Sequence, residues 1–468
     1  MKKTKIVTSI GPASSSVEVF EKMVEAGANV ARINFSHATI EERETVVSTV
    51  KEVRKRTNKN IAILYDTKGP EFRSGVAKED GISLVSGKTI KIVKEDVIGN
   101  EERFTVNHKT AIDALQIGDI VLLENGLMKI EVIEKADDYV NCKIINGGIL
   151  FSKKSLSAPG VDLNIPFISD IDREDIIYAC QHEGDYLAAS FVESAQNIYD
   201  IREILKEQNR EDMKIIAKIE SQTGMNNLES IAIAADGLMV ARGDLGVEVP
   251  MEDLPIAQKK MVKMARKYKK ICIVATEMLE SMKHNPRPTR AEVTDIANAV
   301  YNGTDAVMLS GETTTGEYPV ETVRSMASIC EHIEGSITYS NIFADKKVEN
   351  ATDAIVKSVA EAANSLDAKL IVGTTISGTS ARLISNLEPS CPILALVNSE
   401  EVANRLALNY GIYAKVVDIV SDIDELVALA IKEAKEFTNL KTGDNIIVTG
   451  GLVAGKIGFT NLMKIETL

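Results

Sequence analysis

The sequence predicts an α/β protein with a closed (β/α)8 TIM barrel, an all-β segment inserted into that barrel, and a C-terminal doubly wound α/β unit. Three observations predict this fold. Apolar runs of strand length alternate with amphipathic segments, the alternation stops between about Pro70 and Pro166, and it then returns in two blocks. Parallel strands need crossover connections, which are usually helical, so this alternation is typical of a parallel sheet. A length of 468 residues fits about three domains at roughly 150 residues each.

The barrel is predicted from eight strand–helix units, three before the insert and five after it. We expect the first three strands at Lys5–Ile10, Val30–Phe35 and Ile61–Asp66, with helices at Val17–Ala26 and Ile40–Arg56. The five later strands are expected at Tyr186–Val192, Lys214–Glu220, Gly237–Arg242, Ile271–Glu277 and Ala306–Glu312. Eight parallel strands are the number that a closed (β/α)8 barrel requires.

The insert shows short alternating runs separated by Gly, Asn and Asp, with no long helical repeat. Its clearest strands are Thr89–Val93, Ile120–Leu123, Met128–Ile133 and Tyr139–Ile145. This pattern is typical of an all-β unit. We therefore expect a discontinuous barrel over residues 1–69 and 167–340, with an all-β domain inserted over residues 70–166.

The C-terminal block follows a polar linker near Ser340–Asn350 and is expected to form a regulatory α/β domain over residues 351–468. Its strands are predicted at Leu370–Thr375, Pro392–Val397, Lys415–Asp418, Asn445–Thr449 and Leu462–Thr467. Helices fall between them, for example at Glu401–Asn409 and Ile423–Glu436. A doubly wound sheet of this kind can bind an effector in a crevice at its strand ends.

Charge and cysteine content exclude several classes of protein. The chain has 54 Lys and Arg against 68 Asp and Glu, a formal charge of −14, which gives no support to a nucleic-acid partner. The five cysteines are scattered without a CxxC pair, which indicates reduced thiols and not a zinc site or a disulfide framework. No signal-peptide pattern or membrane-length apolar stretch is found, so we expect a cytoplasmic protein without a membrane partner.

Polar residues gather where the predicted barrel strands end, which is where barrel enzymes place their chemistry. Arg32, Asn34 and Ser36 alternate, so they share one face of the second strand. Lys218 and Glu220 share a face of the fifth strand in the same way. Because buried charges need partners or a metal, these side chains predict a site at the barrel mouth.

The composition of this cluster indicates a reaction class. Glu220 and Asp244 are carboxylates on neighbouring strands and suit one divalent cation with open positions. Asn34, Ser36, Asp66 and Thr67 offer oxygens with one full negative charge, which suits a monovalent cation. Lys218 and Arg32 add positive charge, so the set can stabilise an enolate or a transferring phosphoryl group. The spacing also leaves open a metal-dependent aldolase, or a Schiff-base aldolase with Lys218 as the amine.

At these residues the sequence closely resembles the pyruvate kinase family, and the resemblance covers nearly the whole chain. The motifs that carry it are TKIVTSIGPAS at Thr4–Ser14, RINFSH at Arg32–His37, DTKGPEFR at Asp66–Arg73, AKIE at Ala217–Glu220, MVARGDLGVE at Met239–Glu248, ATEMLESM at Ala275–Met282 and MLSGET at Met308–Thr313. The resemblance implies transfer of the phosphoryl group of phosphoenolpyruvate to ADP, giving pyruvate and ATP in the last step of glycolysis. It also implies a homotetramer, and it implies that the insert over residues 70–166 is a β-barrel lid domain.

The resemblance further implies a role for each matching residue. Lys218, Arg32 and Thr276 would be catalytic, and the substrate would be held by Arg32, Lys218, Gly243, Asp244 and Thr276. Glu220 and Asp244 would bind Mg²⁺ or Mn²⁺, and Asn34, Ser36, Asp66 and Thr67 would bind K⁺. The nucleotide would meet Asn34, His37, Arg73 and Lys154. Glu71 matches the Glu of potassium-dependent members.

An effector site is expected in the C-terminal unit, where a strand closes and a helix opens. The residues are Thr374, Thr375, Ser377, Gly378, Thr379 and Ser380. Hydroxyls and free backbone N–H groups suit a phosphate, although an ordinary Ser/Thr helix cap fits the same pattern. The family resemblance favours a sugar-phosphate or nucleotide activator here. A protein that only senses phosphoenolpyruvate is a further alternative, but a pure binder has no need of Lys218, Glu220 and Asp244 together.

Overall fold

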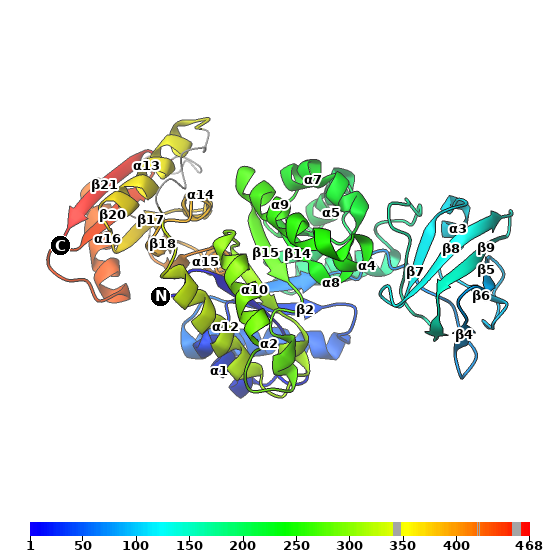
Figure 1. The fold of residues 1–468 in the computed structure, drawn as a ribbon. Helices are drawn as coiled ribbons and strands as arrows, with labels where there is room; N and C mark the ends of the chain where they lie inside the picture. The colour runs from blue at the N-terminus through cyan, green and yellow to red at the C-terminus, as the bar shows by residue number, and fades with distance from the viewer. Residues whose placement is uncertain (340–347, 419, 421, 452–459) are drawn as a thin grey trace.

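Three units follow one another in a row in the computed structural model of the protein (Figure 1). The C-terminal α/β unit lies at one end, the barrel in the middle and the inserted β unit at the other end. The structure describes residues 1–339, 348–418, 420, 422–451 and 460–468. The residues expected to form the centre of the linker, 340–347, lie outside the described part of the chain.

The barrel closes from eight parallel strands, as the sequence predicts. The strands are β1 (Lys5–Ser9), β2 (Val30–Asn34), β3 (Ala62–Asp66), β12 (Tyr186–Ala189), β13 (Lys214–Ile219), β14 (Gly237–Ala241), β15 (Ile271–Ala275) and β16 (Ala306–Leu309). Their order around the ring is β1-β16-β15-β14-β13-β12-β3-β2. The later strands end one to three residues before their predicted ends, because the polar residues that follow leave the ladder and line the mouth.

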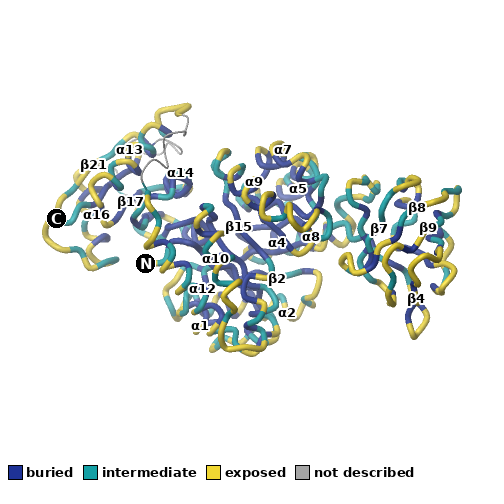
Figure 2. Tube along the Cα trace, viewed as in Figure 1, coloured by how far each residue is buried: buried dark blue, intermediate teal, exposed yellow. Residues whose placement is uncertain are grey.

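Helices surround this ring and bury one face each against it. They are α1 (Val17–Ala26), α2 (Ile40–Thr57), α4 (Asp170–Gln181), α5 (Ala195–Glu207), α6 (Gln222–Asn226), α7 (Leu228–Ala234), α8 (Arg242–Glu248), α9 (Leu254–Lys267), α10 (Arg290–Tyr301), α11 (Gly311–Thr314) and α12 (Pro319–Glu334). Short 3₁₀ turns cover Met251–Asp253 and Glu280–Lys283. Figure 2 shows the buried strands inside and the exposed outer faces of the helices. None of the helices in the described ranges has both the length and the apolar composition needed to span a bilayer.

The insert is built from short strands around its own apolar core. The strands are β4 (Ile82–Leu84), β5 (Thr89–Val93), β6 (Arg103–Thr105), β7 (Ile120–Leu123), β8 (Met128–Lys135), β9 (Tyr139–Asn146), β10 (Gly148–Leu150) and β11 (Leu156–Ser157), with a single-turn helix α3 (Ala111–Ala114). Six of them form one sheet in the order β11-β7-β8-β9-β5-β6, and β10 pairs with β4. The segment 72–75 bonds to both edges of the six-stranded sheet: the Leu156 N–H donates to the Phe72 carbonyl oxygen at 2.8 Å, and the Gly75 N–H donates to the Thr105 carbonyl oxygen at 2.7 Å. The β-barrel lid domain over residues 70–166 stays a prediction.

One buried carboxylate joins the two chain segments that lead into and out of the insert. Asp172, on α4, is 3% exposed. Its Oδ1 accepts a hydrogen bond from the Gly69 N–H at 3.0 Å. Its Oδ2 accepts from Ser169 through the backbone N–H at 3.1 Å and the hydroxyl at 2.6 Å. The chain therefore enters and leaves the insert at neighbouring points.

The C-terminal unit carries a five-stranded sheet with helices on both faces. Its strands are β17 (Leu370–Thr374), β18 (Ile393–Val397), β19 (Ile412–Val416), β20 (Asn445–Gly450) and β21 (Leu462–Thr467), in the order β19-β18-β17-β20-β21. The helices α13 (Ala351–Ser365), α14 (Thr379–Ser385) and α15 (Glu400–Leu406) pack on one face, and α16 (Ile423–Phe437) on the other. The strand predicted at Lys415–Asp418 is misplaced: β19 begins at Ile412, because α15 ends earlier than predicted and a turn at Gly411 starts the strand.

The amino ends of the barrel strands contact the C-terminal unit. The Lys5 Nζ donates to the Ile412 carbonyl oxygen at 2.5 Å and lies 4.3 Å from the centre of the Tyr413 ring. The Tyr186 hydroxyl donates to the Arg405 carbonyl oxygen at 2.6 Å. This end of the barrel is thus closed, which leaves the carboxyl ends of the strands as the open mouth.

Candidate active site

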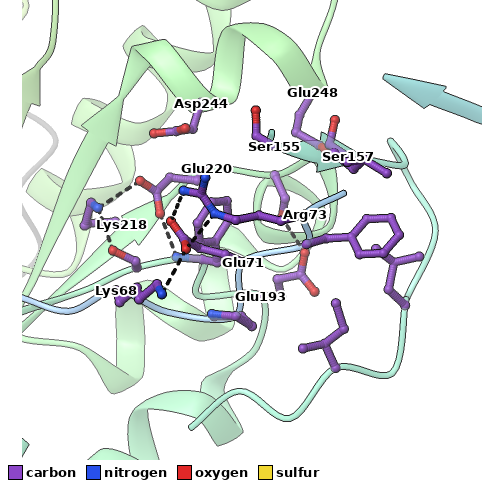
Figure 3. Close-up of a pocket in the computed structure, with 18 of the residues that line it drawn as sticks. Lys68, Glu71, Arg73, Ser155, Ser157, Glu193, Lys218, Glu220, Asp244 and Glu248 are labelled. Carbon is purple, nitrogen blue, oxygen red and sulfur yellow. Dashed lines mark hydrogen bonds and ion pairs between the residues drawn. The ribbon is translucent and has the colours of Figure 1, made fainter. Parts of the chain in front are cut away.

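A cavity of about 520 Å³ lies at the barrel mouth, between the carboxyl ends of the strands and the insert. Most of the predicted site residues line it. They are Arg32, Asn34, Ser36, His37, Asp66, Thr67, Arg73, Lys154, Lys218, Glu220 and Asp244. Figure 3 shows Lys218, Glu220 and Asp244 on the barrel side and Arg73 on the insert side. The structure therefore brings together side chains that are up to 212 residues apart in the sequence (Arg32 to Asp244).

Lys218 lies at the centre of this cavity and is 9% exposed. Its Nζ lies 3.1 Å from Asp66 Oδ1 and 2.9 Å from Glu220 Oε1. The same Nζ donates a hydrogen bond to the Ser190 hydroxyl at 2.6 Å. Burial opposes the charge of Lys218, but Asp66 and Glu220 outweigh burial and hold the pKa of this lysine above its usual value. Lys218 therefore stays an ammonium group at neutral pH.

Arg32 supplies the second positive charge and is fixed from two sides. Its Nε lies 2.7 Å from Asp66 Oδ2, and its Nη1 donates to the Ser9 hydroxyl at 2.8 Å. Asp66 is 1% exposed. Burial opposes its charge, but Arg32 and Lys218 hold the pKa of this carboxyl below its usual value. Asp66 thus remains ionised between two cations.

Glu220 and Asp244 form the carboxylate pair expected for a divalent cation. Burial raises the pKa of Glu220 to about 7, and the charge of Asp244 adds to this rise against the opposing effect of Lys218. In the described residues no group of three or more His, Cys, Asp or Glu side chains could hold a metal. The pair still fits Mg²⁺, which usually takes one or two carboxylates and fills its other positions with water or substrate phosphates. A cation here would relieve the repulsion that raises this pKa.

The backbone next to Glu220 is strained in a way that serves this carboxylate. Phe191 has φ = 54°, a left-handed conformation that is uncommon for a bulky residue. In this conformation its N–H donates to Glu220 Oε2 at 2.6 Å. Strain of this kind persists where the surroundings impose it, which is frequent at functional sites.

The four candidate potassium ligands line one part of the cavity, at the ends of β2 and β3. Thr67 and Asp66 are buried, whereas Ser36 is exposed. The Asn34 Oδ1 accepts a hydrogen bond from the Ser36 N–H at 3.0 Å, which orders this loop. All four residues offer oxygen atoms, and oxygen is the ligand type that hard cations such as K⁺ prefer.

Thr276 and Gly243 lie beside the cavity rather than among its lining residues. The Gly243 N–H donates to the Thr276 hydroxyl at 2.9 Å, which links the ends of β14 and β15. Thr276 has φ = 68°, and its carbonyl oxygen accepts from Arg242 Nη2 at 2.5 Å. Arg242 is held in turn by Asp295 at 2.5 Å. The pairing of Arg242 with Asp295 could not be predicted from the sequence, since an arginine at a strand end gives no sign of a structural partner.

The cations expected to meet the nucleotide are paired with carboxylates. Arg73 binds Glu71 through two hydrogen bonds, at 2.9 Å and 2.7 Å. Burial opposes the charge of Glu71, but Arg73 and Lys68 hold the pKa of this carboxyl below its usual value. Lys154 lies 2.7 Å from Glu124. Nucleotide phosphates would therefore have to compete with these carboxylates.

Two hydroxyl groups of the site were not predicted from the sequence. Ser9 contacts Arg32, and Ser190 contacts Lys218. Ser9 falls inside the motif Thr4–Ser14, so its position was noted but not its role. A single serine at a strand end carries no charge and no spacing signal, so only the three-dimensional arrangement reveals it.

The predicted effector residues lie together in the C-terminal unit, outside the barrel cavity. The Gly378 N–H donates to the Thr375 hydroxyl at 3.1 Å, and the Ser377 and Thr379 hydroxyls lie 3.0 Å apart. Gly378 has φ = 78°, which favours glycine at this turn. The Ser380 hydroxyl contacts that of Thr460. The remaining predicted residue, Thr374, closes β17.

The fold and the barrel mouth define an enzyme of the (β/α)8 class with the donor set of a metal-assisted phosphotransferase. Comparison with known families agrees. Residues 1–323 match the family model of the pyruvate kinase barrel domain, and residues 353–466 match that of the pyruvate kinase alpha/beta domain. The chain belongs to the pyruvate kinase family.

Individual relatives and a solved structure are similar over the full chain. The chain is 43% identical to a pyruvate kinase of Geobacillus stearothermophilus and 44% identical to one of Staphylococcus haemolyticus, in each case over 100% of this chain and 80% of the relative. A crystal structure of a pyruvate kinase from Cryptosporidium parvum superposes with a TM-score of 0.95 at 36% identity. That match covers 100% of this chain and 96% of the other.

Proposed function

We propose that this protein transfers the phosphoryl group of phosphoenolpyruvate to ADP, giving pyruvate and ATP. The observation that carries this proposal is the Lys218 ammonium group, which lies between Asp66 and Glu220 with Arg32 beside them in the cavity. The similarity to named pyruvate kinases over the whole chain supports it. The three units also support our proposed division into a barrel (1–69 and 167–340), a lid (70–166) and an α/β domain (351–468).

In the proposed mechanism, Arg32 and Lys218 hold the anionic substrate. The terminal ADP oxygen attacks phosphorus, and the bond between phosphorus and the enol oxygen breaks. Lys218 stabilises the charge on the transferring group and on the enolate that is left. A divalent cation held by Glu220 and Asp244 supplies further positive charge when bound. A proton added near Thr276 then completes pyruvate.

Asn34, Ser36, Asp66 and Thr67 are proposed to hold K⁺, and His37, Arg73 and Lys154 to contact the nucleotide. The two insert cations, Arg73 and Lys154, support a lid that closes over the barrel mouth and excludes water, which competes for the phosphoryl group. Because Arg73 is already paired with Glu71, closure would exchange this partner for a phosphate.

The experiment is a coupled assay of pyruvate formed from phosphoenolpyruvate and ADP, with Mg²⁺ and K⁺ supplied or withheld. We expect pyruvate and ATP in equal amounts, and loss of both when Mg²⁺ is removed. Pyruvate without ATP, or no reaction under any cation condition, would reject the proposal.

The Schiff-base aldolase alternative is opposed by the state of Lys218. An imine requires a neutral amine, whereas Asp66 and Glu220 keep this lysine protonated. Borohydride reduction with pyruvate present should therefore leave Lys218 without an adduct. A trapped adduct at Lys218 would favour the aldolase.

We also propose an effector site at residues 374–380 and a homotetramer. The grouped hydroxyls support the first, and the family resemblance supports both. Activation by sugar phosphates or nucleotides, lost in a Thr379→Ala variant, would test the site. Analytical ultracentrifugation would test the tetramer.

A further inference from the structure

Ser190 lies directly after β12 and holds a central place in the cavity. It is 2% exposed. Its backbone N–H donates to the Thr67 hydroxyl at 3.1 Å. On its other side lies Gly69, where an added Cβ would come within 2.8 Å of the Ser190 Cβ. The side chain of Ser190 is therefore enclosed, and its hydroxyl has few orientations available.

The hydrogen bonds of this hydroxyl have a direction. The Lys218 Nζ donates to the Ser190 hydroxyl at 2.6 Å, so the Ser190 oxygen accepts this hydrogen bond. The single hydroxyl proton then goes elsewhere. The Thr67 carbonyl oxygen, at 2.7 Å, is closer than Asp66 Oδ1 at 3.2 Å. With its proton directed to Thr67, the hydroxyl presents a lone pair to Lys218.

The other two partners of Lys218 have further tasks. Asp66 binds Arg32 and belongs to the proposed potassium ligands. Glu220 belongs to the proposed divalent site. Cations at these sites would compete with Lys218 for the carboxylate oxygens. Ser190 is uncharged and belongs to neither proposed ligand set, so its contact with Lys218 can persist when cations are bound.

We propose that Ser190 is a positioning residue: its hydroxyl, fixed by the Thr67 carbonyl, holds the Lys218 ammonium group in place for phosphoryl transfer. A lysine side chain has a long flexible stem, so one uncharged fixed acceptor limits where its charge can lie. The role of Ser190 in catalysis rests on the proposed function. The contact itself belongs to the ligand-free protein, where it can be tested separately.

The first test measures the reactivity of Lys218 in the ligand-free, metal-free protein. Reductive methylation with formaldehyde and cyanoborohydride, followed by mass spectrometry of the Lys218 peptide, is compared in wild type, Ser190→Ala and Ser190→Cys. Cysteine keeps the side-chain size but is a weak acceptor. We expect Lys218 to react several-fold faster in both variants. Ser385→Ala is the matched control, because Ser385 is also buried and donates to a backbone carbonyl, that of Tyr410, at 2.7 Å in the C-terminal unit.

The second test is kinetic. Ser190→Ala and Ser190→Cys should lower kcat roughly 10- to 100-fold, the size expected for loss of one hydrogen bond to a charged group, with the KM for ADP unchanged. Ser385→Ala should keep wild-type kcat. Melting temperatures of the variants show whether each remains folded.

The outcomes separate the possible explanations. If Ser190→Cys keeps wild-type kcat and methylation rate, Ser190 only fills space and the proposal is overturned. Unchanged Lys218 reactivity in both variants also overturns it. If wild type forms no pyruvate, the proposed function fails, while the methylation comparison still decides whether Ser190 holds Lys218.

Discussion

At the carboxyl ends of the barrel strands Lys218 lies between two carboxylates, whereas at the amino ends Lys5 lies against a backbone carbonyl and an aromatic ring of the C-terminal unit. Both lysines are at most 9% exposed. Burial lowers the pKa of Lys5 well below its usual value, the charge of Lys2 adds to this fall, and the opposing effect of Glu334 is smaller. The pKa of Lys218 is instead raised above its usual value. Burial alone therefore does not decide the charge of a lysine; its partners do.

The same contrast applies to the carboxylates. Asp66, at the mouth, is held ionised by Arg32 and Lys218. At the closed end, burial raises the pKa of Asp305 to about 7, and Glu388 adds to the rise. The open end thus keeps fixed charges available to a ligand. At the closed end, buried groups such as Asp305 can become neutral and pack between the barrel and the C-terminal unit.

The largest effect should come from exchanging the two lysines for methionine in turn. Lys218→Met should lower turnover by on the order of 10²–10³-fold, because it removes a charge directed at the transition state. Lys5→Met should leave kcat unchanged and alter only the melting temperature. Steady-state kinetics and circular dichroism measure both. Near-normal turnover in Lys218→Met would contradict the conclusion that Lys218 acts in the reaction whereas Lys5 does not.

Potassium removal should affect the open end only. With K⁺ replaced by a quaternary ammonium salt, we expect turnover to fall tenfold or more. A fall of this order is expected when one group that stabilises charge in the transition state is removed. The ligand-free melting temperature should stay the same if the salt concentration is matched. Full activity without K⁺ would contradict the assignment of Asn34, Ser36, Asp66 and Thr67.

Asp172 offers a test of the segment between barrel and insert. Asp172→Ala removes the acceptor for Gly69 and Ser169, and a buried hydrogen-bonding group left without its partner costs roughly 1–3 kcal/mol. We expect faster amide hydrogen exchange at Gly69 and Ser169, with little change in β17–β21. Glu174→Ala, on the same helix at an exposed position, is the control. Equal exchange in both variants would contradict the role of Asp172.

At the closed end we expect a change in the pH dependence of stability and no change in turnover. The folded protein keeps a proton on Asp305 up to about pH 7, whereas an unfolded aspartate loses it near pH 3.9. This group therefore adds stability at low pH, and the contribution is lost as pH rises through about 7. Asp305→Asn should flatten the dependence of the unfolding free energy between pH 4 and 7 by at most about 1.4 kcal/mol per pH unit. An unchanged slope would show that Asp305 is ionised throughout.

The barrel could be predicted from the sequence because each strand is a buried apolar run followed at once by polar residues. The same property predicted the position of Lys218, Glu220 and Asp66. The pairing of Lys218 with Ser190 could not be predicted, because the hydroxyl and the lysine come from different strands and a serine carries no periodic signal. The start of β19 was missed because Ile412 follows a turn that resembles the end of the preceding helix.

The single carboxylate between Gly69 and Ser169 also has a consequence for engineering. The chain leaves the barrel at Gly69 and returns at Ser169, and both residues donate to the same Asp172 side chain. We therefore expect that the insert can be deleted without separating these two points. A shortened chain that connects the two points through a brief linker should keep the barrel and its closed end, and lose the cover over the mouth together with Arg73 and Lys154. Such a chain would show what the barrel side of the site, with Arg32, Lys218, Glu220 and Asp244, can bind by itself.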